Sequence, residues 1–114
     1  MHELYLAESM IKIVVDYAAR DGFKKVNAIL LSYGRFSCIE SKTLQFAFDV
    51  QAKNTPAEGA ALHFKILPAA IHCFSCEKNL EVRAHTGVCP LCGAEDVLLT
   101  AGTEELKILE LDVD

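Results

Sequence analysis

The chain has 114 residues, 52% of them hydrophobic and 24% charged, which is typical of a globular protein and excludes a disordered one. Its formal net charge is −5, and no segment offers the basic face that nucleic-acid binding needs. No apolar run approaches the ~20 residues that span a bilayer, and the start Met1-His2-Glu3-Leu4 does not have the pattern of a secretory signal. We therefore expect a cytoplasmic protein with no membrane and no nucleic-acid partner, whose five cysteines stay reduced.

The first predicted element is an amphipathic helix from about residue 4 to about residue 20. Apolar side chains recur there at the spacing of one helical face, namely at Leu6, Met10, Ile13, Val14 and Tyr17. Gly22 follows at a position typical of a helix C-terminus. Residues 26–31 are apolar and begin with the β-branched Val26, which predicts a largely buried strand.

A second helix is predicted from an apolar stripe that includes Leu44, Ala47 and Phe48 and ends at Lys53-Asn54-Thr55-Pro56. Before it, Ser37-Cys38-Ile39-Glu40 has the spacing of a capping box, in which the hydroxyl and the carboxylate satisfy each other's free backbone donors. Cys38 stands apart from the other cysteines, and we expect it to be a small residue buried at the start of this helix.

Two further strands are predicted near residues 62–66 and 105–113. Leu62, Phe64 and Ile66 alternate with polar residues, as in a strand with one solvated face. In the last segment the apolar positions change phase between Ile108 and Leu109. This change predicts either a β-bulge or a strand buried on both faces.

The predicted fold class is α+β. Residues 1–68 and 103–114 are expected to form one domain, a small three-stranded mixed sheet with two helices. Residues 69–102, bracketed by Pro68 and Gly102, contain four of the five cysteines and are predicted to form an inserted zinc-ribbon-like module.

The inserted segment contains two C-x2-C pairs, Cys73 with Cys76 and Cys89 with Cys92. Each pair can turn its thiolates to one side of a tight loop, and two such loops complete a tetrahedral S4 site that suits Zn(II). Gly93 follows the second pair, where such a loop needs a positive φ. Because four thiolates leave no open coordination position, the zinc is expected to be structural. The competing interpretations are two redox dithiols or an iron site.

Two histidines of the same segment, His72 and His85, can replace a thiolate or lie beside the zinc site. We interpret both as exposed polar residues.

The N-terminal residues can chelate a second metal ion. The α-amine of Met1, the amide nitrogen of His2 and the imidazole Nδ1 of His2 can close fused chelate rings on one ion, and planar nitrogen donors suit Ni(II) or Cu(II). Glu3 can add its carboxylate or its amide. The alternative is a frayed, solvated terminus with no metal role.

Several motifs occur together in order: the Met-His-Glu start, residues 34–40 (GRFSCIE), residues 44–49 (LQFAFD) and the two C-x2-C pairs. Together they resemble the HypA/HybF family of hydrogenase nickel-insertion proteins over essentially the whole chain. The resemblance implies a nickel metallochaperone in which His2 is the primary nickel ligand, Met1 and Glu3 contribute, and Cys73, Cys76, Cys89 and Cys92 hold zinc. It also implies a HypB-type nickel GTPase, a [NiFe]-hydrogenase large-subunit precursor and a second copy of the chain as partners. Glu40 lies where members of the family often carry an acid, so it is either a nickel ligand or part of the capping box.

The alternatives belong to two other function classes. A zinc-ribbon adaptor or nucleic-acid-binding regulatory protein is compatible with the four cysteines. However, residues 69–102 hold two basic side chains against four acidic ones and one aromatic, Phe74. An enzyme is not expected, because no Ser–His–Asp order, phosphate-binding loop or H-E-x-x-H pattern is present.

Overall fold

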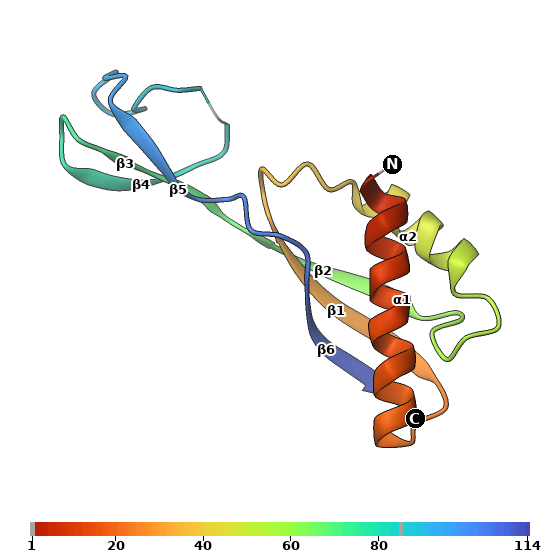
Figure 1. Cartoon of the computed structure of the whole chain (residues 1–114). Coiled ribbons are helices and arrows are strands. Elements are labelled where there is room, and N and C mark those ends of the chain that lie inside the picture. The colour runs from red at the N-terminus through yellow and green to blue at the C-terminus, as the bar shows by residue number, and fades with distance from the viewer. Residues whose placement is uncertain (1, 85) are drawn as a thin grey trace. The chain divides into compact units, whose positions relative to one another are not determined.

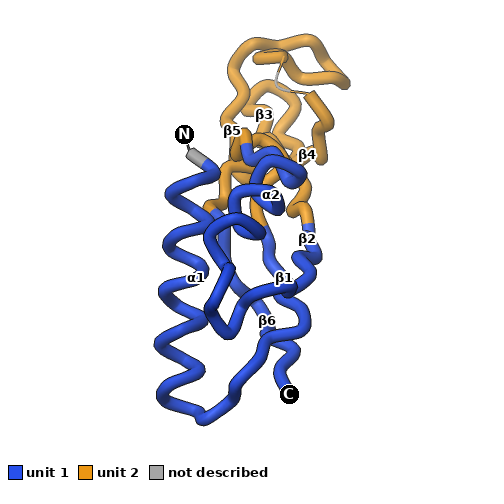
Figure 2. Tube along the Cα trace, turned by 90° about the vertical axis from the view of Figure 1, so that its right-hand side faces the viewer, with its two compact units in different colours: residues 1–32, 39–65, 106–114 blue, residues 33–38, 66–105 orange. Residues whose placement is uncertain are grey.

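The computed structural model describes residues 2–84 and 86–114, apart from the side chain of His2. The chain divides into two compact units (Figure 2). Unit 1 comprises residues 1–32, 39–65 and 106–114, and unit 2 comprises residues 33–38 and 66–105. Residues 33–38 group with unit 2 because their backbone bonds to it: Arg35 N–H donates to Leu67 O at 3.0 Å, and Phe36 N–H donates to Gly102 O at 2.7 Å.

Unit 1 begins with helix α1, His2–Asp21, which confirms the predicted amphipathic helix (Figure 1). Gly22 ends it with a φ of +79°, and its N–H donates to Ala18 O at 2.9 Å. This left-handed conformation is one that glycine adopts without steric cost, so the sequence signal at Gly22 is confirmed.

The sheet of unit 1 contains β1 (Val26–Gly34), β2 (Ala61–Leu67) and β6 (Lys107–Val113) in the order β2-β1-β6. β6 runs antiparallel to β1. β1 and β2 run parallel, as two backbone hydrogen bonds show. Val26 N–H donates to Pro56 O at the start of β1, and Arg35 N–H donates to Leu67 O just after its end. Helix α2, Ser41–Gln51, is the crossover between these parallel strands. The predicted mixed three-stranded sheet with two helices is confirmed.

The phase change in the last strand is a β-bulge. Leu30 pairs with Glu110 and Leu31 pairs with Ile108, so Leu109 has no partner on β1. Leu106, Ile108 and Leu111 are packed against the hydrophobic core, whereas Leu109 is 43% exposed. The bulge therefore keeps the apolar residues on both sides of it facing the core.

One hydrophobic core joins both helices to the sheet. Its fully buried members include Val14 from α1, Leu44 and Phe48 from α2, and Ile29 and Leu31 from β1. The helical positions were predicted from periodicity, and those of β1 from a continuous apolar run that predicted a largely buried strand. No helix among the described residues is long and apolar enough to cross a membrane.

The predicted capping box and the predicted burial of Cys38 are wrong. The N-cap of α2 is Glu40, whose own side chain accepts a hydrogen bond from Lys42 N–H at 3.0 Å. Ser37 Oγ is buried and has no hydrogen-bond partner in the described part of the chain. Cys38 is exposed and adopts a φ of +65°, so the backbone turns there and leaves the helix to start three residues later.

Unit 2 contains an antiparallel sheet of three short strands in the order β4-β3-β5. Its strands are β3 (Ala69–Cys73), β4 (Lys78–Val82) and β5 (Val97–Ala101). β3 pairs with both neighbours, and Cys73 ends it opposite Lys78 and Val97. The sheet thus places the end of β3 and the turn after it at the four-cysteine site.

Candidate metal centre

The four cysteines of the two C-x2-C pairs lie together in unit 2. One ligand atom from each of Cys73, Cys76, Cys89 and Cys92 lies within 4.8 Å of the other three. Cys73 and Cys89 are buried, Cys76 is half-buried and Cys92 is exposed. The predicted convergence of these residues is therefore present in the structure.

The sulfur spacing fits zinc. Cys73 Sγ lies 3.5 Å from Cys92 Sγ, and Cys76 Sγ lies 3.8 Å from Cys89 Sγ. A tetrahedron with Zn–S bonds of about 2.3 Å has sulfur–sulfur edges of about 3.8 Å. Both distances are far longer than the ~2.05 Å of a disulfide. The donor set and its size thus fit a closed Zn(II) site in which each pair supplies two ligands.

The two loops share one backbone feature. The residue after the second cysteine has a positive φ in both, +55° at Glu77 and +74° at Gly93. In the second loop, Gly93 N–H donates to Cys89 O and Cys89 N–H donates to Ala94 O, both at 2.8 Å. The sequence indicated this conformation at Gly93 but not at Glu77, because a non-glycine residue gives no signal for the left-handed region.

A polar contact that the sequence did not reveal braces the first loop. Ser75 Oγ donates to the Asp96 carboxylate, with 2.7 Å to Oδ1 and 2.9 Å to Oδ2, and Phe74 N–H donates to Asp96 O at 3.1 Å. Asp96 lies beyond the second C-x2-C pair in sequence, so the contact fixes the first loop against the segment that follows the second loop. No local pattern marks it, because Ser75 and Asp96 are 21 residues apart.

The crowded thiols have divergent acidities. Backbone hydrogen bonds, above all from Cys92, lower the pKa of Cys89 to about 7. Desolvation, followed by contacts with the other thiols, raises the pKa of Cys76 to about 12. Cys89 is therefore the thiol that ionises more readily, whereas the neighbouring Cys76 stays protonated. A divalent cation would remove this conflict, because it stabilises all four thiolates together.

The remaining candidate residues of this segment lie outside the cysteine cluster. His72 is half-buried on β3, its Nδ1 lies 2.8 Å from Asn79 Oδ1, and its ring meets that of Phe74 edge-on with centroids 4.8 Å apart. His85 lies outside the described residues. Cys38 is not a member of the four-residue group, and its Sγ lies 3.7 Å from Phe36 O.

The N-terminal candidate site lies at the start of α1. Met1 and the His2 side chain lie outside what the structure describes, but α1 itself begins at His2. Glu3 Oε2 accepts a hydrogen bond from Glu40 N–H at 3.3 Å. The fold of unit 1 thus brings together two of the acidic residues that the sequence analysis singled out.

Comparison with known proteins places these features in a family. The family model described as hydrogenase/urease nickel incorporation, metallochaperone, HypA, matches residues 1–113. The hydrogenase maturation factor HypA of Syntrophus aciditrophicus is 50% identical over 114 residues, which cover 100% of both chains. The hydrogenase maturation factor HybF of Klebsiella pneumoniae is 34% identical over 112 residues, or 98% of each chain.

Solved structures support the fold. The solution structure of the Ni metallochaperone HypA from Helicobacter pylori superposes with a TM-score of 0.63 at 20% identity, covering 97% of this chain and 96% of that one. A second HypA solution structure gives a TM-score of 0.69 at 23% identity, covering 99% and 96%. The resemblance deduced from the sequence motifs is confirmed, and the chain belongs to the HypA family of hydrogenase and urease nickel-incorporation metallochaperones.

Proposed function

We propose that this chain binds Ni(II) at its N-terminus and passes it to the large-subunit precursor of a [NiFe]-hydrogenase in the cytoplasm. The proposed role is delivery of the ion, and the protein catalyses no reaction of its own. The observation that carries the proposal is the family match over residues 1–113, which includes both the Met-His-Glu start and the four cysteines. Nickel is the cargo, so its site must release the ion as well as bind it.

The proposed nickel ligands are His2, the Met1 amine and Glu3. Because α1 begins at His2, the amides of its first turn have no acceptor within the helix. An amide nitrogen there can lose its proton to the metal without breaking a helical hydrogen bond. Amine, amide and imidazole nitrogens together give the planar field that Ni(II) prefers. Glu3 Oε2 accepts the Glu40 N–H, which holds the carboxylate in place and leaves Oε1 for the metal.

The proposed role of the cysteine cluster is to hold one structural zinc. Cys73, Cys76, Cys89 and Cys92 would all bind it as thiolates, and the ion would supply folding free energy to unit 2. The sheet of that unit consists of β3 and two short flanking strands, β4 and β5, and many side chains of the flanking strands are exposed. Such a small sheet buries little apolar surface, which makes a metal the main stabilising element.

The proposed protein partners are a HypB-type nickel GTPase, the hydrogenase precursor and a second copy of the chain. Metal transfer between proteins proceeds by ligand exchange, so donor and acceptor must both reach the start of α1. The net charge of −5 is compatible with basic surfaces on these partners.

Nickel titration of the untagged, zinc-loaded chain tests the proposal. His2→Ala is expected to abolish specific nickel binding and to leave the zinc content at one ion per chain. A histidine-free extension at the N-terminus should weaken nickel binding as well, because it converts the Met1 amine into a peptide nitrogen. The same extension at the C-terminus is the matched control. Unchanged nickel affinity in His2→Ala would refute the site.

The zinc assignment is tested separately by Cys76→Ser and Cys92→Ser. Each should lose zinc and the NMR dispersion of residues 66–105, whereas α1 and α2 keep theirs because unit 1 has its own core. Equally tight zinc in a variant with all four cysteines replaced would exclude this cluster as the site.

A further inference from the structure

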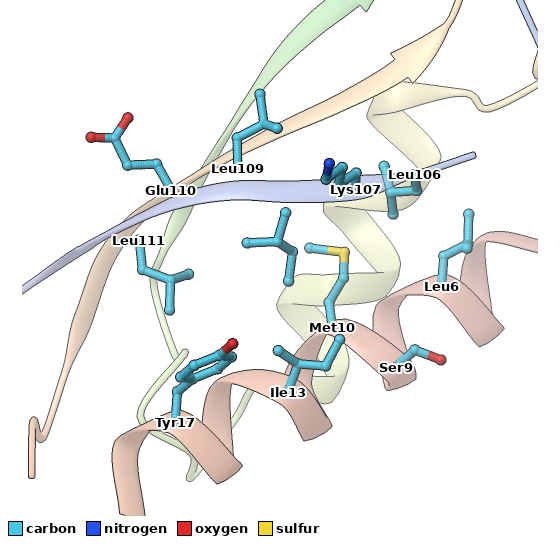
Figure 3. A pocket seen from close by; sticks show the side chains of 11 residues that line it. Leu6, Ser9, Met10, Ile13, Tyr17, Leu106, Lys107, Leu109, Glu110 and Leu111 are labelled. Atoms are coloured by element: carbon cyan, nitrogen blue, oxygen red, sulfur yellow. The ribbon is translucent and has the colours of Figure 1, made fainter. Parts of the chain in front are cut away.

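An apolar groove runs between α1 and β6 in unit 1. It has a volume of about 620 Å3 and is lined by Leu6, Met10, Ile13 and Tyr17 from the helix and by residues 106–111 from the strand segment. In Figure 3, Leu111 points toward Tyr17 of α1, whereas Leu109 and Glu110 point away from the helix. Ile13 is 42% exposed and Tyr17 is 39% exposed, so the apolar wall of the groove is open to a ligand.

The groove lies along a free strand edge. β6 is the outer strand of the sheet and pairs only with β1 in the order β2-β1-β6 of the described residues. The opposite edge of an outer strand presents a row of N–H and C=O groups that can pair with an added strand. An edge beside an apolar groove is the arrangement that recognises an extended peptide, because the edge binds the backbone and the groove takes alternate side chains.

One end of the groove is acidic. The groove continues past Tyr17 and Leu111 into a hollow lined by Asp21 and Asp114 and by no basic side chain. Arg20 lies 4.3 Å over the Tyr17 ring and pairs with Asp21 at 3.4 Å, so the charge of Asp21 is offset. Asp114 is not offset in this way, because it accepts its hydrogen bond from the neutral Asn27, at 2.8 Å. A ligand with positive charge at this end is therefore favoured.

The charge pattern argues against a second copy of the chain as the occupant. Antiparallel pairing of β6 with itself would bring the start of one strand beside the end of the other. The start holds Glu104, Glu105 and Lys107, a net charge of −1, and the end carries Asp112 and Asp114, so two regions of net negative charge would face each other. Like charges on adjacent strands destabilise the pairing.

We propose that this groove docks an extended peptide segment of a partner protein, which adds to the free edge of β6 as an antiparallel strand. Its apolar side chains at alternate positions enter the groove, and basic residues at its N-terminal end lie beside Asp21 and Asp114. β6 has seven residues, so the segment is of similar length. This docking site is separate from the nickel ligands and does not depend on them.

The test uses a synthetic probe on the full zinc-loaded chain. The probe is the acetylated, amidated peptide Lys-Lys-Val-Thr-Val-Thr-Val with a fluorescent label, and binding is followed by fluorescence polarisation. Ile13→Glu places a carboxylate on the groove wall and is expected to weaken binding by at least about tenfold. Val15→Glu is the matched control, because Val15 is 39% exposed on the same helix and does not line the groove. Its affinity should stay within about twofold of the unmodified chain.

Two further arms use the unmodified protein and so do not depend on a variant folding. Methylating alternate peptide nitrogens of the probe removes the donors that pair with a strand edge, and binding should fall by at least about tenfold. Replacing the two lysines by glutamates should also weaken it. His2→Ala should bind the probe as tightly as the parent chain, which separates this site from the nickel site.

Three results would overturn the docking proposal. They are no saturable binding up to about 1 mM probe, equal binding by Ile13→Glu, and equal binding of the methylated probe. A dimer of the parent chain that is lost in Ile13→Glu, without probe binding, would assign the groove to a second copy instead.

Discussion

The Glu3 carboxylate accepts a hydrogen bond from the backbone N–H of Glu40, with 3.3 Å between Oε2 and N. Glu40 in turn caps α2, because its Oε1 accepts the Lys42 N–H at 3.0 Å. Two successive carboxylate–amide bonds therefore connect the first turn of α1 to the start of α2. Of the two roles that the sequence left open for Glu40, the structure shows a capping role, although the partner is Lys42 and not Ser37.

Removing the cap should destabilise unit 1. Glu40→Ala is expected to lower the free energy of unfolding by about 1 kcal/mol, because Lys42 N–H loses its acceptor. Glu40→Ser is the matched control, since serine is a good N-cap and carries no carboxylate. Urea unfolding followed by circular dichroism measures both. A loss in Glu40→Ser as large as that in Glu40→Ala would mean that the carboxylate acts through something other than the cap.

Gly34 should tolerate no side chain. A Cβ at this position would collide with Gly102 O and come within 2.6 Å of Glu104 Oε1. Gly34→Ala is therefore expected to cost about 1–3 kcal/mol of stability through overpacking. Urea unfolding measures the loss. Gly87→Ala, where an added Cβ meets nothing within 4 Å but the φ is +78°, shows by comparison the cost of left-handed backbone strain alone. A Gly34→Ala variant as stable as the parent chain would show that the close approach costs nothing.

The sequence predicted the elements whose side chains have one buried face. The periodicity of α1 and the alternation in β2 reflect the burial of Met10, Val14 and Leu62 in the core, so both elements were found. The same patterns also included Ile13, Tyr17 and Ile66, which are exposed. The phase change at Leu109 predicted either a bulge or a strand buried on both faces, and the structure has the bulge, because apolar residues on both sides of it face one core. The cysteine site was predictable because metal chemistry fixes the ligand spacing.

The parts that could not be predicted depend on backbone turns or on distant partners. The spacing of Ser37 and Glu40 fits a capping box, but a non-glycine φ of +65° at Cys38 leaves no trace in the sequence. β4 and β5 were not predicted as strands, because neither has a fully buried residue to mark a face. The Ser75–Asp96 contact joins residues on opposite sides of the cysteine cluster, so only the folded unit reveals it.

Zinc binding should release fewer protons at higher pH. The pKa of Cys89 is lowered to about 7 in the metal-free fold, so this thiol is mostly ionised at pH 8 and mostly protonated at pH 6. The number of protons released per zinc is therefore expected to fall by about one between pH 6 and pH 8. Calorimetry in buffers with different ionisation enthalpies measures it.

Nickel affinity should fall steeply as the pH drops from 8 to 6, because protons compete with the metal for nitrogen ligands. Reference pKa values of ~7.7 for an α-amine and ~6.5 for imidazole give a fall of about 100-fold over this range when both groups bind. Loss of the His2 amide proton would add about another 100-fold, since each proton released contributes about tenfold per pH unit. The chain with a histidine-free N-terminal extension keeps the imidazole but not the free amine, so its decrease should be only about fourfold if the imidazole alone titrates. The comparison counts the nitrogen ligands without a structure of the nickel complex. A flat affinity in the parent chain would exclude the terminal nitrogens and direct attention to the neighbouring carboxylates of Glu3 and Glu40.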